Sequence, residues 1–227
     1  MIEIQKSKDR GSANHGWLRT MHSFSFGEYF NPEKMGFGPL LVLNEDYIEP
    51  SKGFPAHPHE NMEIVTIVLE GAVEHKDSMG NHGIIKAGEV QTMSAGTGIL
   101  HSEFNHSNKK KTHLLQIWIL PKEKGLKPSY EQKKFILKKN KLCKIISGKK
   151  SDKALYIHQD ATLSLGNFDK YKEISYKTKK GLYLFVIEGA VEISGKELID
   201  GDAAAITEVK KINIKFKLKT NLLIIEV

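Results

Sequence analysis

The 227-residue chain has one cysteine, two arginines and no long apolar run. Cys143 has no partner within the chain, so no intrachain disulfide can form, and this favours a reducing compartment. No apolar run approaches the roughly 20 residues of a membrane-spanning helix, and no apolar stretch follows a basic N-terminal head. With 40% hydrophobic and 27% charged residues the composition is globular. We therefore expect a cytoplasmic protein.

The positive charge raises the question of a nucleic-acid partner. The formal net charge is +7, and lysines cluster at 109–111, 122–127 and 133–153. Arg10 and Arg19 are the two arginines, however, and phosphate and guanine recognition depends on the planar guanidinium group that lysine lacks. Lysine is also the usual residue of solvated surfaces. The composition therefore predicts no nucleic-acid partner.

An internal repeat organises the chain. The segment 68–74 has the sequence Val-Leu-Glu-Gly-Ala-Val-Glu, and 186–192 has Val-Ile-Glu-Gly-Ala-Val-Glu. After a short deletion the similarity continues, with 86–90 answered by 199–203. Repeats of this kind indicate two copies of one structural unit.

Each copy has the pattern of an all-β unit. The runs 64–69 and 114–120 are apolar, rich in β-branched residues and bounded by turn residues, and 212–219 alternates apolar with polar residues. Closely spaced glycines between 71 and 98 favour hairpins over crossover helices.

These patterns predict a first unit over 1–125, a connection over 126–152 and a second unit over 153–227. The connection is rich in Lys, Gly and Ser, and one helix is expected in it, over 130–141.

Two pairs of side chains carry metal chemistry. His57 and His59 are two residues apart, so on a strand both imidazoles point to the same face, and His101 and Glu103 repeat this spacing. Three imidazoles and a carboxylate can hold a first-row divalent metal and leave positions open for water, substrate or dioxygen.

The surrounding sequence resembles a known family. The segments Gly53 to Gly71 and Gly88 to Asn105 are similar to the two cupin motifs, and the whole chain resembles a pirin-family bicupin. The N-terminal run from Asn14 to Phe26 also resembles the start of pirin-like proteins, although Thr97 stands where many cupins have proline. The resemblance implies an all-β fold of two tandem cupin barrels, also called double-stranded β-helices or jelly rolls.

The resemblance also implies the ligand set. It assigns one divalent transition metal per chain to His57, His59, His101 and Glu103; iron is favoured, and manganese, cobalt, nickel, copper and zinc are alternatives. Glu63 is a rival fourth ligand, because it lies an even number of residues from His59 and many cupins use a glutamate at this spacing. The pirin resemblance favours Glu103 and leaves Glu63 as an outer partner or an ordinary strand residue.

The second unit is expected to hold no metal. The repeat offset places Ser175 and Lys177 opposite His57 and His59, and it places Ile214 and Phe216 opposite His101 and Glu103. Among the remaining histidines, His22 is a candidate for the rim of the metal pocket, to which the N-terminal arm brings either His22 or Phe24 and Phe26.

The resemblance implies a quercetin 2,3-dioxygenase as the first functional hypothesis. In that reaction a flavonol is held through its deprotonated 3-hydroxyl, dioxygen opens the central ring and carbon monoxide is released. Glu103 is the candidate catalytic base. The alternative, by resemblance to eukaryotic pirins, is a non-enzymatic iron-binding, redox-sensitive regulator. A monomer is expected in either case.

Overall fold

A computed structural model describes all residues from 1 to 227. The chain forms twenty-two β-strands and one short 3-10 helix, Ser7–Asp9, so no helix could cross a membrane. It divides into two compact units, which we call the first barrel and the second barrel. The first barrel contains residues 11–135 and 155–159, and the second contains residues 1–10, 136–154 and 160–227.

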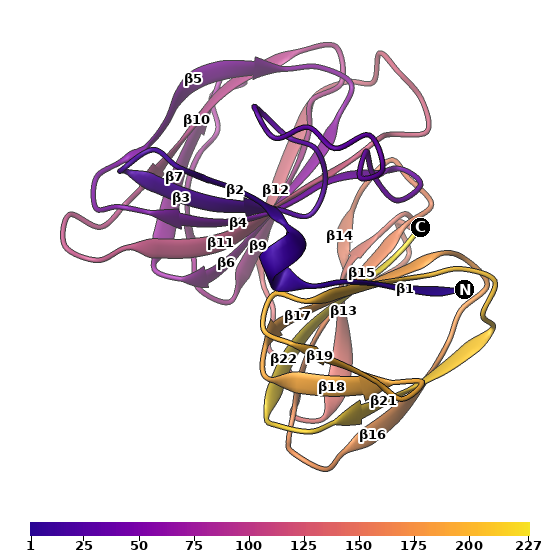
Figure 1. Cartoon of the computed structure of the whole chain (residues 1–227). Coiled ribbons are helices and arrows are strands. Elements are labelled where there is room, and N and C mark those ends of the chain that lie inside the picture. The colour runs from indigo at the N-terminus through magenta and orange to yellow at the C-terminus, as the bar shows by residue number, and fades with distance from the viewer. The chain divides into compact units, whose positions relative to one another are not determined.

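The first barrel consists of two antiparallel sheets. The larger has the order β12-β9-β6-β11-β4-β3-β2, and the smaller has the order β5-β10-β7-β8 (Figure 1). The strands are β2 (Gly11–Asn14), β3 (Leu18–His22), β4 (Leu40–Ile48), β5 (Gly53–His59), β6 (Glu63–Glu70), β7 (Ala72–Asp77), β8 (His82–Lys86), β9 (Glu89–Ser94), β10 (Ile99–Asn105), β11 (Thr112–Ile119) and β12 (Ser129–Lys134). The short strand β14 (Leu155–Tyr156) lies in the segment 155–159.

The second barrel repeats this construction. Its larger sheet contains the order β1-β20-β17-β22-β15-β13, and its smaller sheet has the order β16-β21-β18-β19. The strands are β1 (Ile2–Gln5), β13 (Lys141–Ser147), β15 (Thr162–Phe168), β16 (Glu173–Lys177), β17 (Leu182–Glu188), β18 (Ala190–Ile193), β19 (Lys196–Ile199), β20 (Ala203–Ile206), β21 (Lys211–Phe216) and β22 (Thr220–Glu226). The predicted all-β fold of two tandem cupin barrels is thus confirmed.

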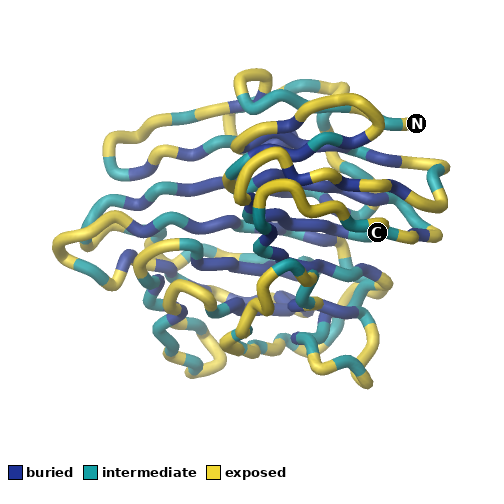
Figure 2. Tube along the Cα trace, turned by 90° about the horizontal axis from the view of Figure 1, so that it is seen from below, coloured by how far each residue is buried: buried dark blue, intermediate teal, exposed yellow.

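The interiors of the two barrels differ. Buried residues follow the strands and exposed residues follow the connections in both (Figure 2). In the second barrel, apolar side chains from both sheets form one continuous core, which includes Phe168, Leu184 and Phe216. The first barrel contains two smaller apolar clusters, one around Ile48 and one around Ile64. It also contains buried polar side chains, which include His75, His101 and Glu103. The first barrel therefore keeps part of its interior for polar side chains.

The compact units differ from the predicted ranges 1–125, 126–152 and 153–227. Residues 1–10 belong to the second barrel, because β1 pairs with β20. The expected helix over 130–141 is wrong: β12 pairs with β9 at the edge of a sheet. Lysine, glutamate and glutamine favour helices in isolation, but the unpaired edge of β9 offers this segment a full set of backbone partners, and such tertiary context overrides propensity.

The structure shifts the predicted alignment of the second copy of the repeat on the first by two residues in the strand that corresponds to β10. Val73 and Val191 are equivalent in the repeat; Val73 pairs with Asn105 in β10, and Val191 pairs with Phe216 in β21. Counting back along these strands makes Ile212 equivalent to His101 and Ile214 equivalent to Glu103. The predicted partners, Ile214 and Phe216, were two residues too far along, because strand pairing sets the equivalence across the deletion.

The predicted counterparts of His57 and His59 in the second barrel, Ser175 and Lys177, are also displaced, because the first barrel has a β-bulge that the second lacks. The pairing of β5 with β10 shifts between His101 and Glu103, whereas β16 pairs with β21 without a shift. Tyr176, not Ser175 or Lys177, is therefore opposite the residue equivalent to His101. Ser175 and Lys177 are exposed, and Tyr176 packs against the apolar core.

Candidate metal centre

Two paired strands, β5 and β10, carry all four predicted ligands. Along β10 the buried residues alternate with less buried ones, and His101 and Glu103 are both on the buried face. His57 lies directly opposite His101, and His59 lies opposite Ile99. Cross-strand neighbours on one face come within side-chain contact, so the predicted period-2 spacing brings the histidines together.

Three imidazoles converge at this place. Ring nitrogens of His57, His59 and His101 all lie within 4.8 Å of one another, and Nε2 of His57 is 3.0 Å from Nε2 of His101. Nδ1 of His57 is 2.8 Å from the Pro55 carbonyl oxygen, which can only accept, so Nδ1 carries a hydrogen, and Nε2 carries the lone pair in the neutral ring that binds a metal. A histidine oriented in this way is prepared to bind a metal through Nε2.

The electrostatics also suit a metal. Burial lowers the pKa of His59 to about 4, with a further contribution from His57. Burial and the neighbouring histidines lower the pKa of His101 to about 3. Both rings are therefore uncharged at neutral pH, and neutral imidazole is the form that binds first-row divalent metals.

Glu103 is the one carboxylate of the set and is held by hydrogen bonds. Gln116 Nε2 donates to Glu103 Oε2 at 2.8 Å, and the Thr66 hydroxyl lies 3.2 Å from Oε1. Burial raises the pKa of this carboxyl to about 7, against the effect of these hydrogen bonds. Glu103 lies outside the group of His57, His59 and His101 and is connected to it through His101, whose ligand atoms lie within 4.8 Å of those of Glu103. Imidazole and carboxylate groups together are a donor chemistry that suits first-row divalent metals.

His75 extends the cluster and was not predicted. Ligand atoms of His75, His101 and Glu103 also lie within 4.8 Å of one another, so His101 belongs to both groups. His75 is fully buried, and its Nε2 is 3.1 Å from Asp77 Oδ2. The signal in the sequence was the spacing of Val73, His75 and Asp77, which places all three on one face of β7.

A row of polar residues crosses the larger sheet beneath Glu103. Directly paired positions on five adjacent strands are occupied by His22, Asn44, Gln116, Thr66 and Gln91. Nδ1 of His22 is 2.8 Å from Asn44 Oδ1, and the Thr66 hydroxyl is 2.9 Å from Gln116 Oε1. Gln116 and Thr66, which hold Glu103, therefore lie in the same row of the sheet as His22 and Asn44.

A cavity of about 720 Å³ opens beside the histidines. Its walls include His57, His59 and Glu103, and five aromatic residues also line it. These five are Trp17, Phe26, Tyr29, Phe54 and Trp118. A concave space that combines aromatic side chains with polar ones is suited to a small planar molecule that carries polar groups.

Of the three residues of the N-terminal arm considered for the rim of the metal pocket, two lie at the cavity. His22 and Phe26 line the cavity. Phe24 does not belong to the lining; it is 6% exposed and buried in the barrel.

Glu63, the rival ligand, lies elsewhere. Its carboxylate accepts a 2.7 Å hydrogen bond from Ser94, and Oε1 is 3.4 Å from Nδ1 of His158. Thr66, three residues along β6, contacts Glu103. Odd and even residues of a strand point to opposite faces, so Glu63 points away from the cluster. The even spacing from His59 did not hold because a turn over 60–62 separates β5 from β6.

Glu63 provides a pH prediction for the metal-free protein. Burial raises the pKa of Glu63 above its ordinary value, although Ser94 and His158 act in the opposite direction. Its contribution to stability is therefore complete below the unfolded pKa, about 4.3, and is lost as the pH rises through the folded pKa. We expect Glu63→Gln, which does not titrate, to gain stability relative to the original protein as the pH rises above about 4.3.

Urea unfolding of both proteins after chelation, at a series of pH values, measures this gain. Each unit of pKa shift corresponds to about 1.4 kcal/mol. A stability difference that stays constant with pH would show that Glu63 has an ordinary pKa in the folded protein.

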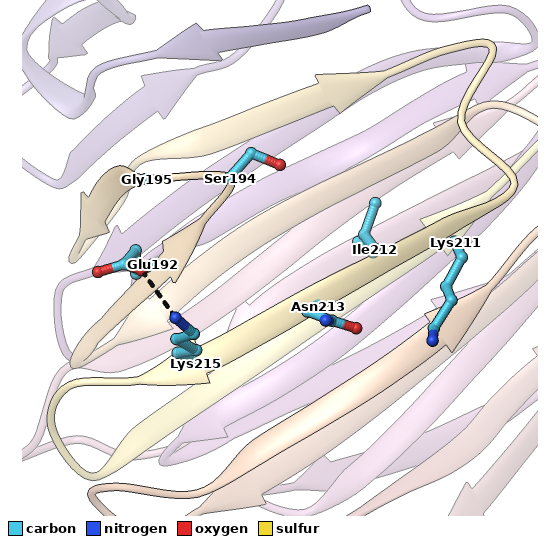
Figure 3. A pocket seen from close by; sticks show the side chains of 7 residues that line it. All are labelled: Glu192, Ser194, Gly195, Lys211, Ile212, Asn213 and Lys215. Atoms are coloured by element: carbon cyan, nitrogen blue, oxygen red, sulfur yellow. Dashed lines mark ion pairs between the residues drawn. The ribbon is translucent and has the colours of Figure 1, made fainter.

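The second barrel has a hollow of a different kind. It is lined by Glu192, Ser194, Lys211, Asn213 and Lys215 among others (Figure 3). The three residues of β21 in this set are exposed and alternate with buried apolar ones, so the hollow is on the outer surface. Glu192 forms an ion pair with Lys215 at 3.4 Å. The hollow has no histidine and does not repeat the ligand pattern of the first barrel.

Two cupin barrels in tandem, with a histidine cluster opening into the interior of one of them, define the class of bicupins. Comparison with known proteins narrows this class. The pirin model matches residues 3–119, and the model of the quercetinase C-terminal cupin domain matches residues 144–227. The chain belongs to the pirin family.

Similar proteins cover nearly the whole chain. A quercetin 2,3-dioxygenase of Escherichia coli (strain K12) is 44% identical over 216 residues, which are 94% of this chain and 93% of that protein. The crystal structure of YhhW from Escherichia coli has a TM-score of 0.97 and 42% identity, and covers 100% of this chain and 97% of that one. The structure of bacterial pirin YhhW from Escherichia coli in complex with nickel(II) has a TM-score of 0.96 and 41% identity, with 100% and 99% covered.

Proposed function

We propose that the first barrel holds one divalent transition metal through His57, His59, His101 and Glu103. The converging ring nitrogens, the low pKa values of His59 and His101, and the Pro55 contact that orients His57 support this assignment. The nickel(II) complex of the similar bacterial pirin supports it independently. The equivalent interior positions of the second barrel are occupied by packed apolar residues, and we therefore expect one ion per chain.

The proposed activity is cleavage of a flavonol, such as quercetin, by dioxygen. The observation that carries it is the opening of the histidine cluster into an aromatic-lined cavity large enough for a planar three-ring molecule. The E. coli relative named quercetin 2,3-dioxygenase supports the same activity. When bound, the metal supplies a Lewis acid that lowers the pKa of a hydroxyl group and orients the reactants.

The chain contributes three things to this reaction. Trp118, Phe26 and Phe54 line the space beside the histidines and exclude water from a flat aromatic substrate. Glu103 also lines the cavity and accepts the proton of the 3-hydroxyl group. Gln116 and Thr66 hold the Glu103 carboxylate in position for that transfer.

The activity is tested by loading the metal-free protein with one metal at a time. We expect the iron, manganese, cobalt, nickel or copper form to consume dioxygen with quercetin, to release carbon monoxide and to bleach the near-ultraviolet band of the flavonol. The zinc form is expected to be slow or inert, because zinc has no redox chemistry. An oxygen electrode measures the consumption of dioxygen, and a carbon monoxide assay measures the release of the product.

If every metal form leaves flavonols intact while the protein binds iron and changes conformation on oxidation, the proposed activity is wrong. A redox-sensitive regulator would then replace it.

A further inference from the structure

His75 is buried against the proposed ligands, and the chemistry at the cavity does not use it. It lies on β7 directly opposite Glu103, and Asp77 lies directly opposite His101. The side chains of His75 and Asp77 are both 0% exposed. The rings of His75 and His101 are neighbours, with centroids 5.3 Å apart. A buried histidine beside a metal ligand is in the position of an outer partner that orients this ligand.

Asp77 holds one nitrogen of His75. Nε2 of His75 is 3.1 Å from Asp77 Oδ2, and Asp77 also accepts hydrogen bonds from the backbone of Met79 and from the backbone and side chain of Asn81. Although burial acts in the opposite direction, the hydrogen bonds from Asn81 and His75 lower the pKa of Asp77. The ionised carboxylate can only accept, so Nε2 of His75 carries a hydrogen. Burial lowers the pKa of His75, so its other nitrogen, Nδ1, carries a lone pair.

Nδ1 of His75 and Nδ1 of His101 are both buried and have no hydrogen-bond partner. Strand β10 lies between β5 and β7 in the sheet. The two nitrogens are on opposite sides of an imidazole ring, so a His101 ring whose Nε2 faces His57 on β5 turns Nδ1 toward β7, the strand of His75. One ring nitrogen of His75 lies within 4.8 Å of one of His101. Buried polar atoms without partners are rare, so this pair requires an explanation.

The tautomers explain why these two nitrogens are not bonded in the structure. With neutral rings, Nδ1 of His57 donates to the Pro55 carbonyl oxygen, and Nε2 of His57 is an acceptor. Nε2 of His101, 3.0 Å away, is therefore the donor, and Nδ1 of His101 carries a lone pair. Nδ1 of His101 and Nδ1 of His75 are then both acceptors, and two acceptors cannot share a hydrogen bond.

A ligand role for His101 reverses one of these roles. A neutral histidine that binds a metal through Nε2 has its hydrogen on Nδ1. One hydrogen leaves Nε2 of His101 and one is taken up at Nδ1, so the ring stays neutral and its number of protons is unchanged. Nδ1 then becomes a donor on the side of β7. Asp77 already accepts four hydrogen bonds, which leaves Nδ1 of His75 as the buried acceptor without a donor.

We propose that His75, held by Asp77, is a positioning residue for His101: Nδ1 of His75 accepts a hydrogen bond from Nδ1 of His101 when Nε2 of His101 is a metal ligand. This inference rests on the proposed metal site, and it adds a residue that stabilises the metal-binding tautomer of one ligand. His75 touches neither the metal nor the substrate in this account.

Nuclear magnetic resonance tests the hydrogen bond without any substitution. The protein is labelled with ¹⁵N-histidine and compared in its metal-free and zinc-loaded forms at about pH 8, where a histidine of ordinary pKa is neutral. Zinc is chosen because its d¹⁰ ion is diamagnetic. We expect a nitrogen–nitrogen coupling across the hydrogen bond between Nδ1 of His101 and Nδ1 of His75 in the zinc form, and none in the metal-free form. Absence of this coupling in the zinc form would overturn the inference.

Zinc affinity, measured by competition with a chelating dye, gives a second readout. His75→Leu is expected to weaken zinc binding by about 10- to 100-fold, the usual effect of losing an outer partner. His75→Asn, whose amide oxygen can take the place of Nδ1 as acceptor, is expected to restore most of this loss. Tyr130→Phe is the matched control, because the ring of Tyr130 stacks on His75 at 4.6 Å while its hydroxyl donates to Gln132. This variant should keep the full affinity.

The outcomes separate this inference from the metal site on which it rests. If His75→Leu binds zinc as tightly as the original protein, the positioning role of His75 is wrong and the metal site stands. If His75→Leu does not fold, the coupling measured in the original protein decides. If the original protein binds no zinc, the proposed metal site itself is wrong.

Discussion

Replacing both His57 and His59 by alanine is expected to reduce the metal content from one ion per chain to about zero. The double variant leaves His101 as the one imidazole of the group formed by these three residues. Loss of an outer-shell partner alone typically costs about 10- to 100-fold in metal affinity or activity, and loss of two ligands costs more. Flavonol cleavage should disappear together with the metal.

The matched control for this variant also removes two histidines from the first barrel. His82 and His106 both contact Glu74 at the surface, and their side chains are about half exposed. Their double replacement by alanine should retain one ion per chain by elemental analysis. Retention of metal by the His57/His59 variant, or two ions per chain in the original protein, would contradict the site assignment.

Glu103→Gln is expected to separate metal binding from turnover. The three imidazoles remain, so metal retention should weaken only moderately. Flavonol cleavage should fall by about 10²- to 10⁴-fold, the usual contribution of a positioned general base, because an amide cannot accept the proton of the 3-hydroxyl. Metal content and the rate of carbon monoxide release, measured on the same preparation, give the two quantities.

Glu63→Gln is the matched control for this prediction. It makes the same chemical change at a buried glutamate of the same barrel, but Glu63 contacts Ser94 and His158 rather than the histidine cluster. We expect unchanged metal content and unchanged turnover. A loss of metal in Glu63→Gln with full retention in Glu103→Gln would assign the ligand role to Glu63.

Much of the fold could be predicted from the sequence because its signals are local. The repeated Glu-Gly-Ala-Val-Glu hairpin indicated two copies of one unit, and the alternation over 212–219 indicated strands. The domain assignment of residues 1–10 could not be predicted in the same way. These residues pair with β20, about 200 positions later in the chain, and no local pattern specifies such a partner.

The site residues likewise include some that spacing along one strand predicts and others that depend on strand pairing. The period-2 spacing of His57 with His59 and of His101 with Glu103 predicted that each pair shares a face, and the structure brings the three histidines together. The places of His75, Gln116 and the row of polar residues on the larger sheet depend on which strands become neighbours. Spacing within one strand cannot show that His22 and Asn44 lie in the same row as the residues that hold Glu103.

Insertion of dioxygen into a flavonol at this centre is the reaction on which the proposed function rests. Its most direct test is turnover of quercetin under ¹⁸O₂ by protein loaded with one metal per chain. Ring opening by a dioxygenase breaks two carbon–carbon bonds at the carbon that bears the 3-hydroxyl and releases that carbon with its oxygen as carbon monoxide. We predict that both labelled atoms appear in the ring-opened product and that one unlabelled carbon monoxide is released per flavonol. A product without label, or bleaching of quercetin without carbon monoxide, would contradict the account.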